Sequence, residues 1–144
     1  MNALLLDNQV CFAVHAASRA LDGVYRRELA ELGLTYPQYL VMLVLWERER
    51  VTVKELGVAL RLDSGTLSPL LKRLEAAGFV RRERSASDER SVLVRLTDKG
   101  TELRQAAVRV PGRILEATGL EMGELADLRR TLSRMTLSLT EAAS

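Results

Sequence analysis

The stretch from Thr52 to Thr97 constrains the fold more than any other part of the sequence, because it holds two short apolar segments separated by a tight polar turn. Thr52 and Glu55 have the spacing of a capping box, which predicts that a helix begins here. This helix is expected to end at a turn formed by Arg61 and Leu62. The residues that it should bury are Leu56, Ala59 and Leu60.

A second helix is predicted from Ser64 to Ala77, with the side chain of Asp63 capping its free backbone N–H groups. Leucines recur at helical spacing on its buried side, namely Leu67, Leu70, Leu71 and Leu74. Gly78 provides the left-handed residue at which such a helix ends. Pro69 lies near the first turn and predicts a slight bend rather than a break.

A basic two-stranded hairpin is predicted next. Residues 79–84 are rich in arginine, residues 91–97 alternate in polarity, and residues 85–90 form a polar turn. Between Lys72 and Arg95 the sequence has seven cations and four anions, a local net charge of +3, whereas the whole chain carries only +2. The positive charge is therefore concentrated in this segment, as neutralisation of phosphates would require.

Two capped helices followed by a basic hairpin predict a winged helix–turn–helix head that binds DNA. Short hydroxyl groups near the start of the second helix suit a close approach to base edges, and long cations suit phosphates or guanine. The alternative without DNA binding is a solvated helical hairpin beside a sheet edge, where the arginines protect the edge from aggregation. The residues expected to contact DNA are Ser64, Thr66, Ser68, Lys72, Arg73, Arg82 and Arg84.

Composition places the chain among ordinary single-domain soluble proteins. It has 144 residues, 47% of them hydrophobic and 28% charged. The longest apolar run, residues 39–46, is too short to cross a bilayer, and the N-terminus has no signal-peptide pattern. One cysteine excludes an intrachain disulfide, so we expect a cytoplasmic protein with no membrane association. We find no metal-ligand spacing, cofactor motif or catalytic set, and therefore expect no cofactor, no metal and no enzyme activity.

Helices are also predicted before the head. Asp7 is a candidate N-cap for a helix from Asn8 to about Leu32, which carries an apolar stripe through Val10, Val14, Ala17, Leu21 and Val24. Thr35 and Gln38 form a second capping box, with Pro37 in the first turn. The helix that follows, to about Arg48, is apolar nearly all round and should form the buried centre.

After the hairpin, Thr97 should cap a helix that Pro111 interrupts. A last helix begins at a cap formed either by Thr118 with Glu121 or by Glu121 with Glu124. Its apolar residues repeat in heptads at Leu125, Leu128, Leu132, Met135 and Leu139.

Amphipathic helices at both ends, residues 5–33 and 98–142, predict a two-fold homodimer around the DNA-binding head of residues 51–97. Two heads could then reach successive major grooves, about 34 Å apart. The alternative is that the stripes only close the core of a monomer. The expected fold class is mainly α with a small β-hairpin, as one domain over residues 1–144.

Several motifs make the chain resemble the MarR family of winged-helix regulators along essentially its whole length. They are Asp88-x-Arg90, Leu96-Thr97-x-x-Gly100 and the Leu71, Leu74 and Gly78 run. Within that family the chain is similar to the organic hydroperoxide resistance regulators. The stretches responsible are residues 8–13, 34–41, 62–67 and 88–91.

The resemblance implies a repressor in which Cys11 senses peroxide and in which Tyr25 and Tyr36 of the opposite subunit hydrogen-bond to its sulfur. It also implies that Arg90, in the turn that Asp88 opens, enters the minor groove. Where the family usually has a third tyrosine this chain has His15, which at i+4 could support a thiolate if protonated. No second cysteine is present, so the chain would be of the one-cysteine type.

The expected chemistry follows from the thiolate, which attacks an organic hydroperoxide and becomes a sulfenic acid. Without a resolving cysteine, a small cellular thiol would complete a mixed disulfide, and the altered dimer would release its operator. Two alternatives remain at this stage. Cys11 could be an inert core residue, with regulation by a small aromatic ligand, or the protein could be a thiol peroxidase with turnover.

Overall fold

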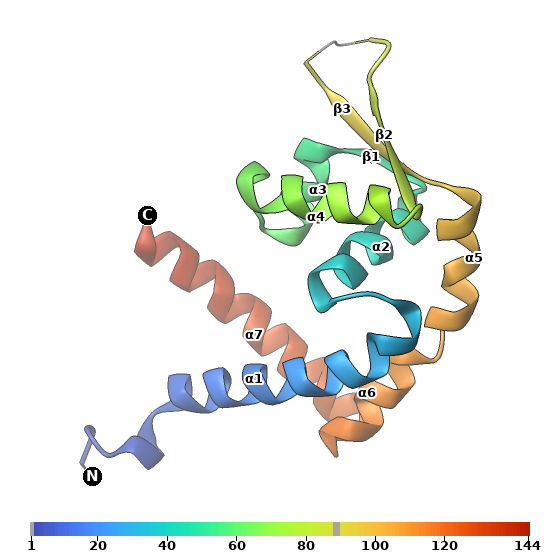
Figure 1. Cartoon of the computed structure of the whole chain (residues 1–144). Coiled ribbons are helices and arrows are strands. Elements are labelled where there is room, and N and C mark those ends of the chain that lie inside the picture. Colours follow the sequence, from blue (N-terminus) through green and yellow to red (C-terminus); the bar gives the residue numbers. More distant parts are fainter. Residues whose placement is uncertain (1, 88–89) are drawn as a thin grey trace. The chain divides into compact units, whose positions relative to one another are not determined.

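Helices dominate the chain, as their capping boxes and apolar periodicity predict, and a small sheet lies among them (Figure 1). The computed structural model describes residues 2–87 and 90–144 and divides after Val108 into two units. The first unit contains η1 (Leu6–Asn8), α1 (Val10–Leu29), η2 (Ala30–Leu32), α2 (Tyr36–Arg48), β1 (Arg50–Thr52), α3 (Val53–Leu60), α4 (Ser64–Ala76), β2 (Val80–Arg84), β3 (Val92–Leu96) and α5 (Asp98–Ala107). The second contains α6 (Val110–Thr118) and α7 (Met122–Ala143).

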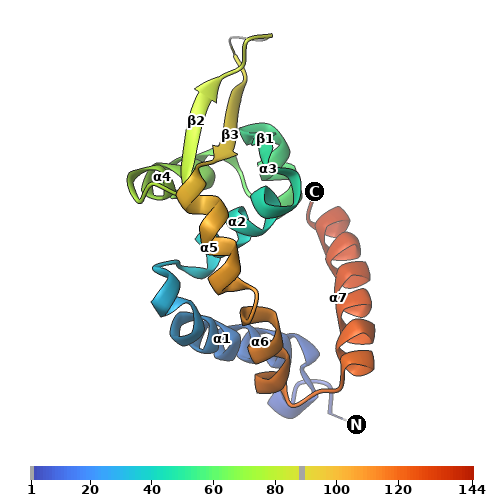
Figure 2. The same cartoon turned by 90° about the vertical axis from the view of Figure 1, so that its right-hand side faces the viewer.

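The predicted hairpin is confirmed, but it belongs to a sheet of three strands. The strands are antiparallel in the order β1-β3-β2, and Val51 of β1 pairs with Val94 of β3. Figure 2 shows β2 and β3 extending away from the helices of the first unit. Strand β1 was not predicted, because three residues directly before a helix are too few to show an alternating pattern.

Helix α2 lies at the centre of the first unit and packs against α1, α3, α4 and α5. Its buried residues are Tyr39, Val41, Met42, Val44 and Leu45. The four leucines predicted for α4 are all buried, and so is Leu56 of α3. The prediction for Ala59 and Leu60 was wrong, since Ala59 is exposed and Leu60 only half-buried. Helix α3 is about two turns long, and its buried contact is made by Leu56 near the middle of the helix.

The start predicted for the first helix was also wrong. Asp7 lies in η1, and α1 begins after Gln9, whose side chain makes no capping bond to the helix. The amides of Asn8 and Gln9 instead donate to the carbonyls of Asn2, Ala3 and Leu5. These bonds hold the preceding turn in place of a helix. At the other end, Gly33 with φ of 69° closes the helical segment, as predicted.

In the second unit, Pro111 starts a helix rather than interrupting one. Helix α5 ends at Ala107, and α6 begins at Val110 with Pro111 in its first turn, where a missing N–H costs nothing. Glu121 and Glu124 form the capping box of α7, which decides between the two predicted starts. No residue of α7 is buried, although the structure describes the whole helix.

Among the described residues, no single helix is long and apolar enough to cross a membrane. The segments Val10–Leu32 and Tyr36–Arg48 pass such a test only together, as a pair bent by 64°.

Candidate functional site

The helices α3 and α4 have the N-cap residues that the sequence predicts, but the capping box of α3 is only half formed, because the Glu55 carboxylate accepts from the Thr52 hydroxyl and not from its backbone N–H. Thr52 accepts a hydrogen bond from the Glu55 backbone N–H at 3.0 Å. Asp63 accepts one from the Thr66 N–H at 2.7 Å. This bond lowers the pKa of Asp63 below its ordinary value. The Asp63 carboxylate therefore stays ionised at the N-terminus of α4, where the helix macrodipole favours negative charge.

The turn between α3 and α4 depends on a close backbone approach at Gly57. A Cβ placed there would lie 2.8 Å from the Leu62 carbonyl oxygen and 3.3 Å from a methyl of Leu67. Arg61 takes a left-handed conformation with φ of 57°, and its N–H bonds back to α3. A turn at Arg61 was predicted, but its left-handed conformation was not, since left-handed turns usually carry Gly or Asn.

One face of α4 is exposed and polar. Pro69 does not break the helix, which runs unbroken from Ser64 to Ala76. The leucines face the core, so the small hydroxyl groups and the cations are left to solvent. The exposed residues that were predicted as one surface are Ser64, Thr66, Ser68, Lys72 and Arg73.

Arg82 of β2 is tied to Glu75 of α4. Its backbone N–H donates to one carboxylate oxygen at 3.0 Å, while Nε and Nη2 donate to the other at 3.2 and 3.1 Å. The backbone bond, followed by the guanidinium, lowers the pKa of Glu75. Arg82 thus fixes α4 against the hairpin and is only half exposed, unlike the other residues predicted for the basic surface.

The remaining predicted hairpin residues lie toward the far end of the strands. Arg84 and Arg90 are exposed, whereas Asp88 falls outside the described residues. Sequence reasoning missed Arg50 and Arg95, which pair across β1 and β3. The pairing of Arg50 with Arg95 could not be predicted, because strand β1 itself was not predicted.

Cys11 is the second residue of α1 and is exposed. A helix starting at Asn8 would place Cys11 one turn inside, whereas the observed start at Val10 places it among the first N–H groups. The side chain of Phe12 beside it is 46% exposed, and His15, one turn later, is exposed as well. The described structure therefore does not bury Cys11 as a core residue.

Tyr25 and Tyr36, the other predicted members of this site, do meet. Their ring centroids lie 4.5 Å apart, and Tyr39 lies 5.8 Å from Tyr25. Burial, followed by the two neighbouring phenols, raises the pKa of Tyr25 to about 12. Burial, followed by Asp22, raises the pKa of Tyr36. Both phenols stay protonated near neutral pH and can act as hydrogen-bond donors.

Within one chain, Cys11 and this pair of tyrosines are far apart. Cys11 and Tyr25 belong to the same unbroken helix, and fourteen residues at about 1.5 Å each separate them by roughly 21 Å. Fourteen residues also amount to nearly four complete turns, so both side chains emerge on the same side of α1.

Comparison with known proteins decides the family. The family model for the transcriptional regulator SarA/Rot matches residues 24–107. The organic hydroperoxide resistance transcriptional regulator of Bacillus subtilis is 48% identical over 130 residues, which cover 90% of this chain and 86% of the relative. The chain belongs to the MarR family of winged-helix transcriptional regulators.

This MarR-family chain is also similar to two other proteins over most of its length. The HTH-type transcriptional regulator TtmR of Methylorubrum extorquens is 53% identical over 130 residues, covering 90% of this chain and 67% of the relative. The solved structure of reduced AbfR bound to DNA has a TM-score of 0.82 at 35% identity. It covers 96% of this chain and 95% of that chain. The family resemblance inferred from the sequence is therefore confirmed. The prediction of a DNA-binding regulator rather than an enzyme is confirmed by the same relatives.

Proposed function

We propose that this MarR-family regulator binds operator DNA as a cytoplasmic homodimer and releases it when an organic hydroperoxide oxidises Cys11. The exposed polar face of α4 would enter the major groove, with Arg84 and Arg90 of the hairpin at the adjacent minor groove and backbone. The B. subtilis relative and the DNA-bound structure of AbfR support both parts of this proposal.

Two helices present apolar surface that suits a second copy. On α1, Val10 is 66% exposed and Leu21 38%. On α7, Leu137 is 61% and Leu139 56% exposed. Apolar side chains at regular spacing along two helices favour a partner helix, and a homodimer with two-fold symmetry covers the same surface on both subunits.

A two-fold axis would also complete the cysteine site. Cys11, His15, Ser18, Asp22 and Tyr25 follow one another at spacings of four and three residues along one side of α1. Ser18 lies midway between Cys11 and Tyr25. If two α1 helices pair antiparallel about an axis beside Ser18, each Cys11 lies opposite the partner subunit's Tyr25, against which Tyr36 packs.

The oxidation would proceed at this composite site. The Cys11 thiolate attacks one peroxide oxygen, the O–O bond breaks, and the departing alkoxide takes a proton to become an alcohol. Sulfur is oxidised to sulfenic acid while the peroxide is reduced. A small thiol then displaces water to form a mixed disulfide. The protonated phenols would donate hydrogen bonds to the thiolate or to the departing oxygen, and these bonds change once the thiolate is lost.

The observation that carries the proposal is the exposed Cys11 on the same side of α1 as Tyr25, yet separated from it by the length of the helix. Operator release transmitted through this interface would couple the sulfur to the spacing of the two heads.

The test is binding to DNA upstream of the protein's own gene, with and without one equivalent of cumene hydroperoxide. Wild type should lose binding on oxidation, whereas Cys11→Ser should bind equally well with or without oxidant. Tyr25→Phe should be oxidised more slowly and still bind DNA when reduced. Binding that survives oxidant in wild type would rule out the sensor, and catalytic turnover with added thiol would instead indicate a peroxidase.

A further inference from the structure

Three arginines form a row across the sheet. Arg95 of β3 is paired directly with Arg50 of β1 on one side and with Arg81 of β2 on the other. Directly paired residues point to the same face of a sheet. Val51 and Val94, the next residues along, are buried, so the arginine row lies on the outward face, where all three are exposed.

Such a row is unfavourable unless something offsets it, because like charges directly opposite each other destabilise a sheet. Arg95 has one carboxylate partner, Glu83, at 3.2 Å. Both of these side chains are well exposed, and exposed ion pairs contribute little. Among the described residues, Arg50 makes no ion pair. The charge on this face therefore exceeds what the chain itself neutralises.

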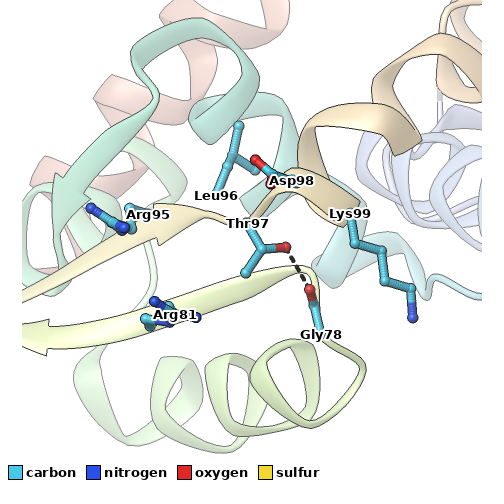
Figure 3. A pocket seen from close by; sticks show the side chains of 7 residues that line it. All are labelled: Gly78, Arg81, Arg95, Leu96, Thr97, Asp98 and Lys99. Atoms are coloured by element: carbon cyan, nitrogen blue, oxygen red, sulfur yellow. Dashed lines mark hydrogen bonds between the residues drawn. The ribbon is translucent and has the colours of Figure 1, made fainter.

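The row borders two adjoining hollows. The larger, of about 530 Å³, is lined by Trp46, Glu49, Arg50, Arg95, Leu96, Thr101 and Arg104. The smaller, of about 350 Å³, shares Arg95 and Leu96 and adds Arg81 and Lys99 (Figure 3). The larger hollow thus has three arginines against the carboxylates of Glu49 in its lining and of Glu83 on Arg95, a net charge of +1.

The walls of the larger hollow are held in place. The Trp46 indole N–H donates to the Gly100 carbonyl at 2.9 Å, which fixes the ring. Glu49 has φ of 65° and ψ of −43°, a conformation that only glycine adopts without strain. Its N–H bonds to the Leu45 carbonyl at 2.7 Å, and its carbonyl accepts from Leu96 at 3.3 Å. Backbone strain persists only where the surroundings enforce it, so these bonds hold Glu49 in place at the edge of the hollow.

We propose that this hollow binds a phosphate group through Arg50, Arg95 and Arg104, with Trp46 as its wall. Guanidinium groups match phosphate oxygens in pairs, and several converging on one side of a sheet suit a dianion. The phosphate comes either from the DNA backbone beyond the bases reached by α4 and the hairpin, or from a phosphorylated small molecule. The site needs neither Cys11 nor its oxidation.

The chain has one tryptophan, Trp46, so its fluorescence reports on this hollow. Wild-type protein is titrated with pyrophosphate against sodium chloride of equal ionic strength. A saturable fluorescence change is expected for pyrophosphate, with affinity at least tenfold weaker in Arg50→Gln and in Arg104→Gln. Arg19→Gln, an exposed arginine of α1, is the matched control and should behave as wild type. No saturable change, or an equal change in Arg50→Gln, would overturn the proposal.

Two duplexes then identify the source. One carries the operator alone and the other extends it by about 10 base pairs, one helical turn, on each side. If the DNA backbone supplies the phosphate, Arg50→Gln with Arg104→Gln weakens binding to the extended duplex only and lowers its salt dependence. If a free phosphorylated ligand does, both duplexes bind the double variant as they bind wild type. The pyrophosphate titration uses no DNA and no oxidant, so its failure leaves the proposed redox function untouched, and the converse also holds.

Discussion

Two regions differ in how many stabilising contacts they receive from within one chain. They are the region from β1 to α5 and the N-terminal half of α1. In the first region, Thr52, Asp63 and Thr97 cap the three helices with their own side chains, and leucines fill the space between. The first three turns of α1 have no side-chain cap and bury no residue.

The two regions are proposed to have different functions. The surface proposed to read DNA is fixed by contacts within one chain and should keep its shape at any protein concentration. The surface proposed to carry the sensor is incomplete in one chain and should gain its contacts from a second copy. Substitutions in the two regions are therefore expected to differ in kind as well as in size.

The same substitution should have opposite effects at Gly100 and Gly23. A Cβ at Gly100 would lie 2.1 Å from the Phe79 carbonyl oxygen, whereas none of the described atoms lies within 4 Å of one at Gly23. Gly100→Ala should lower the free energy of unfolding by about 3 kcal/mol or more, since backbone must move. Gly23→Ala should raise it by about 0.5–1 kcal/mol through better helix propensity. Urea denaturation measures both.

If Gly23→Ala instead lowers the free energy of unfolding, the dependence of that loss on protein concentration shows its cause. If the loss appeared only at protein concentrations where dimers form, the second subunit would have to approach α1 closely at that glycine. A loss at all concentrations would contradict the open environment of Gly23.

Leucine-to-alanine substitutions test the same contrast through burial. Leu71 is 1% exposed and Leu21 38%. Leu71→Ala should cost about 3 kcal/mol of unfolding free energy at any protein concentration. Leu21→Ala should change the unfolding of dilute protein little but raise the dissociation constant of the dimer, as sedimentation would show. Equal effects on monomer unfolding would refute the distinction between the two regions.

The cap at Asp63 should show itself in acid. Because its pKa is lowered on folding, the ionised Asp63 contributes stability above the unfolded value of 3.8 that is lost as the pH falls through the folded value. Asp63→Asn keeps an acceptor for the Thr66 N–H without the charge, so its deficit relative to wild type should shrink as the pH is lowered. Asp63→Ala should lower the melting temperature at neutral pH as well. Thermal melts across this range provide the measurement, and a pH-independent deficit in Asp63→Asn would exclude the charge effect.

The smallest effect is expected at the tyrosine pair. Folding raises the pKa of Tyr25 from 10.0 to about 12, so its contribution to stability is complete below pH 10 and is lost as the pH rises toward 12. Tyr36→Phe removes one cause of the shift and should lower the pKa of Tyr25. Phenolate absorbance followed on folded protein, with circular dichroism as the control for unfolding, measures this. An unchanged midpoint would show that Tyr36 does not contribute and that burial and Tyr39 set the pKa.

Much of the β1–α5 region follows from local sequence. Capping residues and leucine spacing located α3 and α4, and the alternating residues before Thr97 located β3, because each of these signals acts between neighbours in the chain. The contact between Tyr25 and Tyr36 was not predicted, because no local pattern links residues eleven positions apart on two helices. The resemblance implied only that both phenols bond to the cysteine sulfur, which stays a prediction.

The errors have a common physical source. Asp7 could have capped a helix, but the side chains of Asn8 and Gln9 bond to the preceding turn instead. Strand β1 exists only because β3, some forty residues later, pairs with it. The bonds between Arg82 and Glu75 were not foreseen either, although the role predicted for Arg82 at the DNA surface stays a prediction. In each case a partner that local patterns do not reveal decided the outcome.

The tie between Glu75 and Arg82 affects how a signal would pass through the proposed dimer. Because both the backbone and the guanidinium of Arg82 are bonded to one carboxylate, we expect α4 and the β2–β3 hairpin to move together. A displacement that begins at α1 would then alter the distance and angle between two intact reading units. Each unit would still be able to bind its own half of a two-fold symmetric operator. Binding should therefore be lost because the two units can no longer bind both halves at the same time.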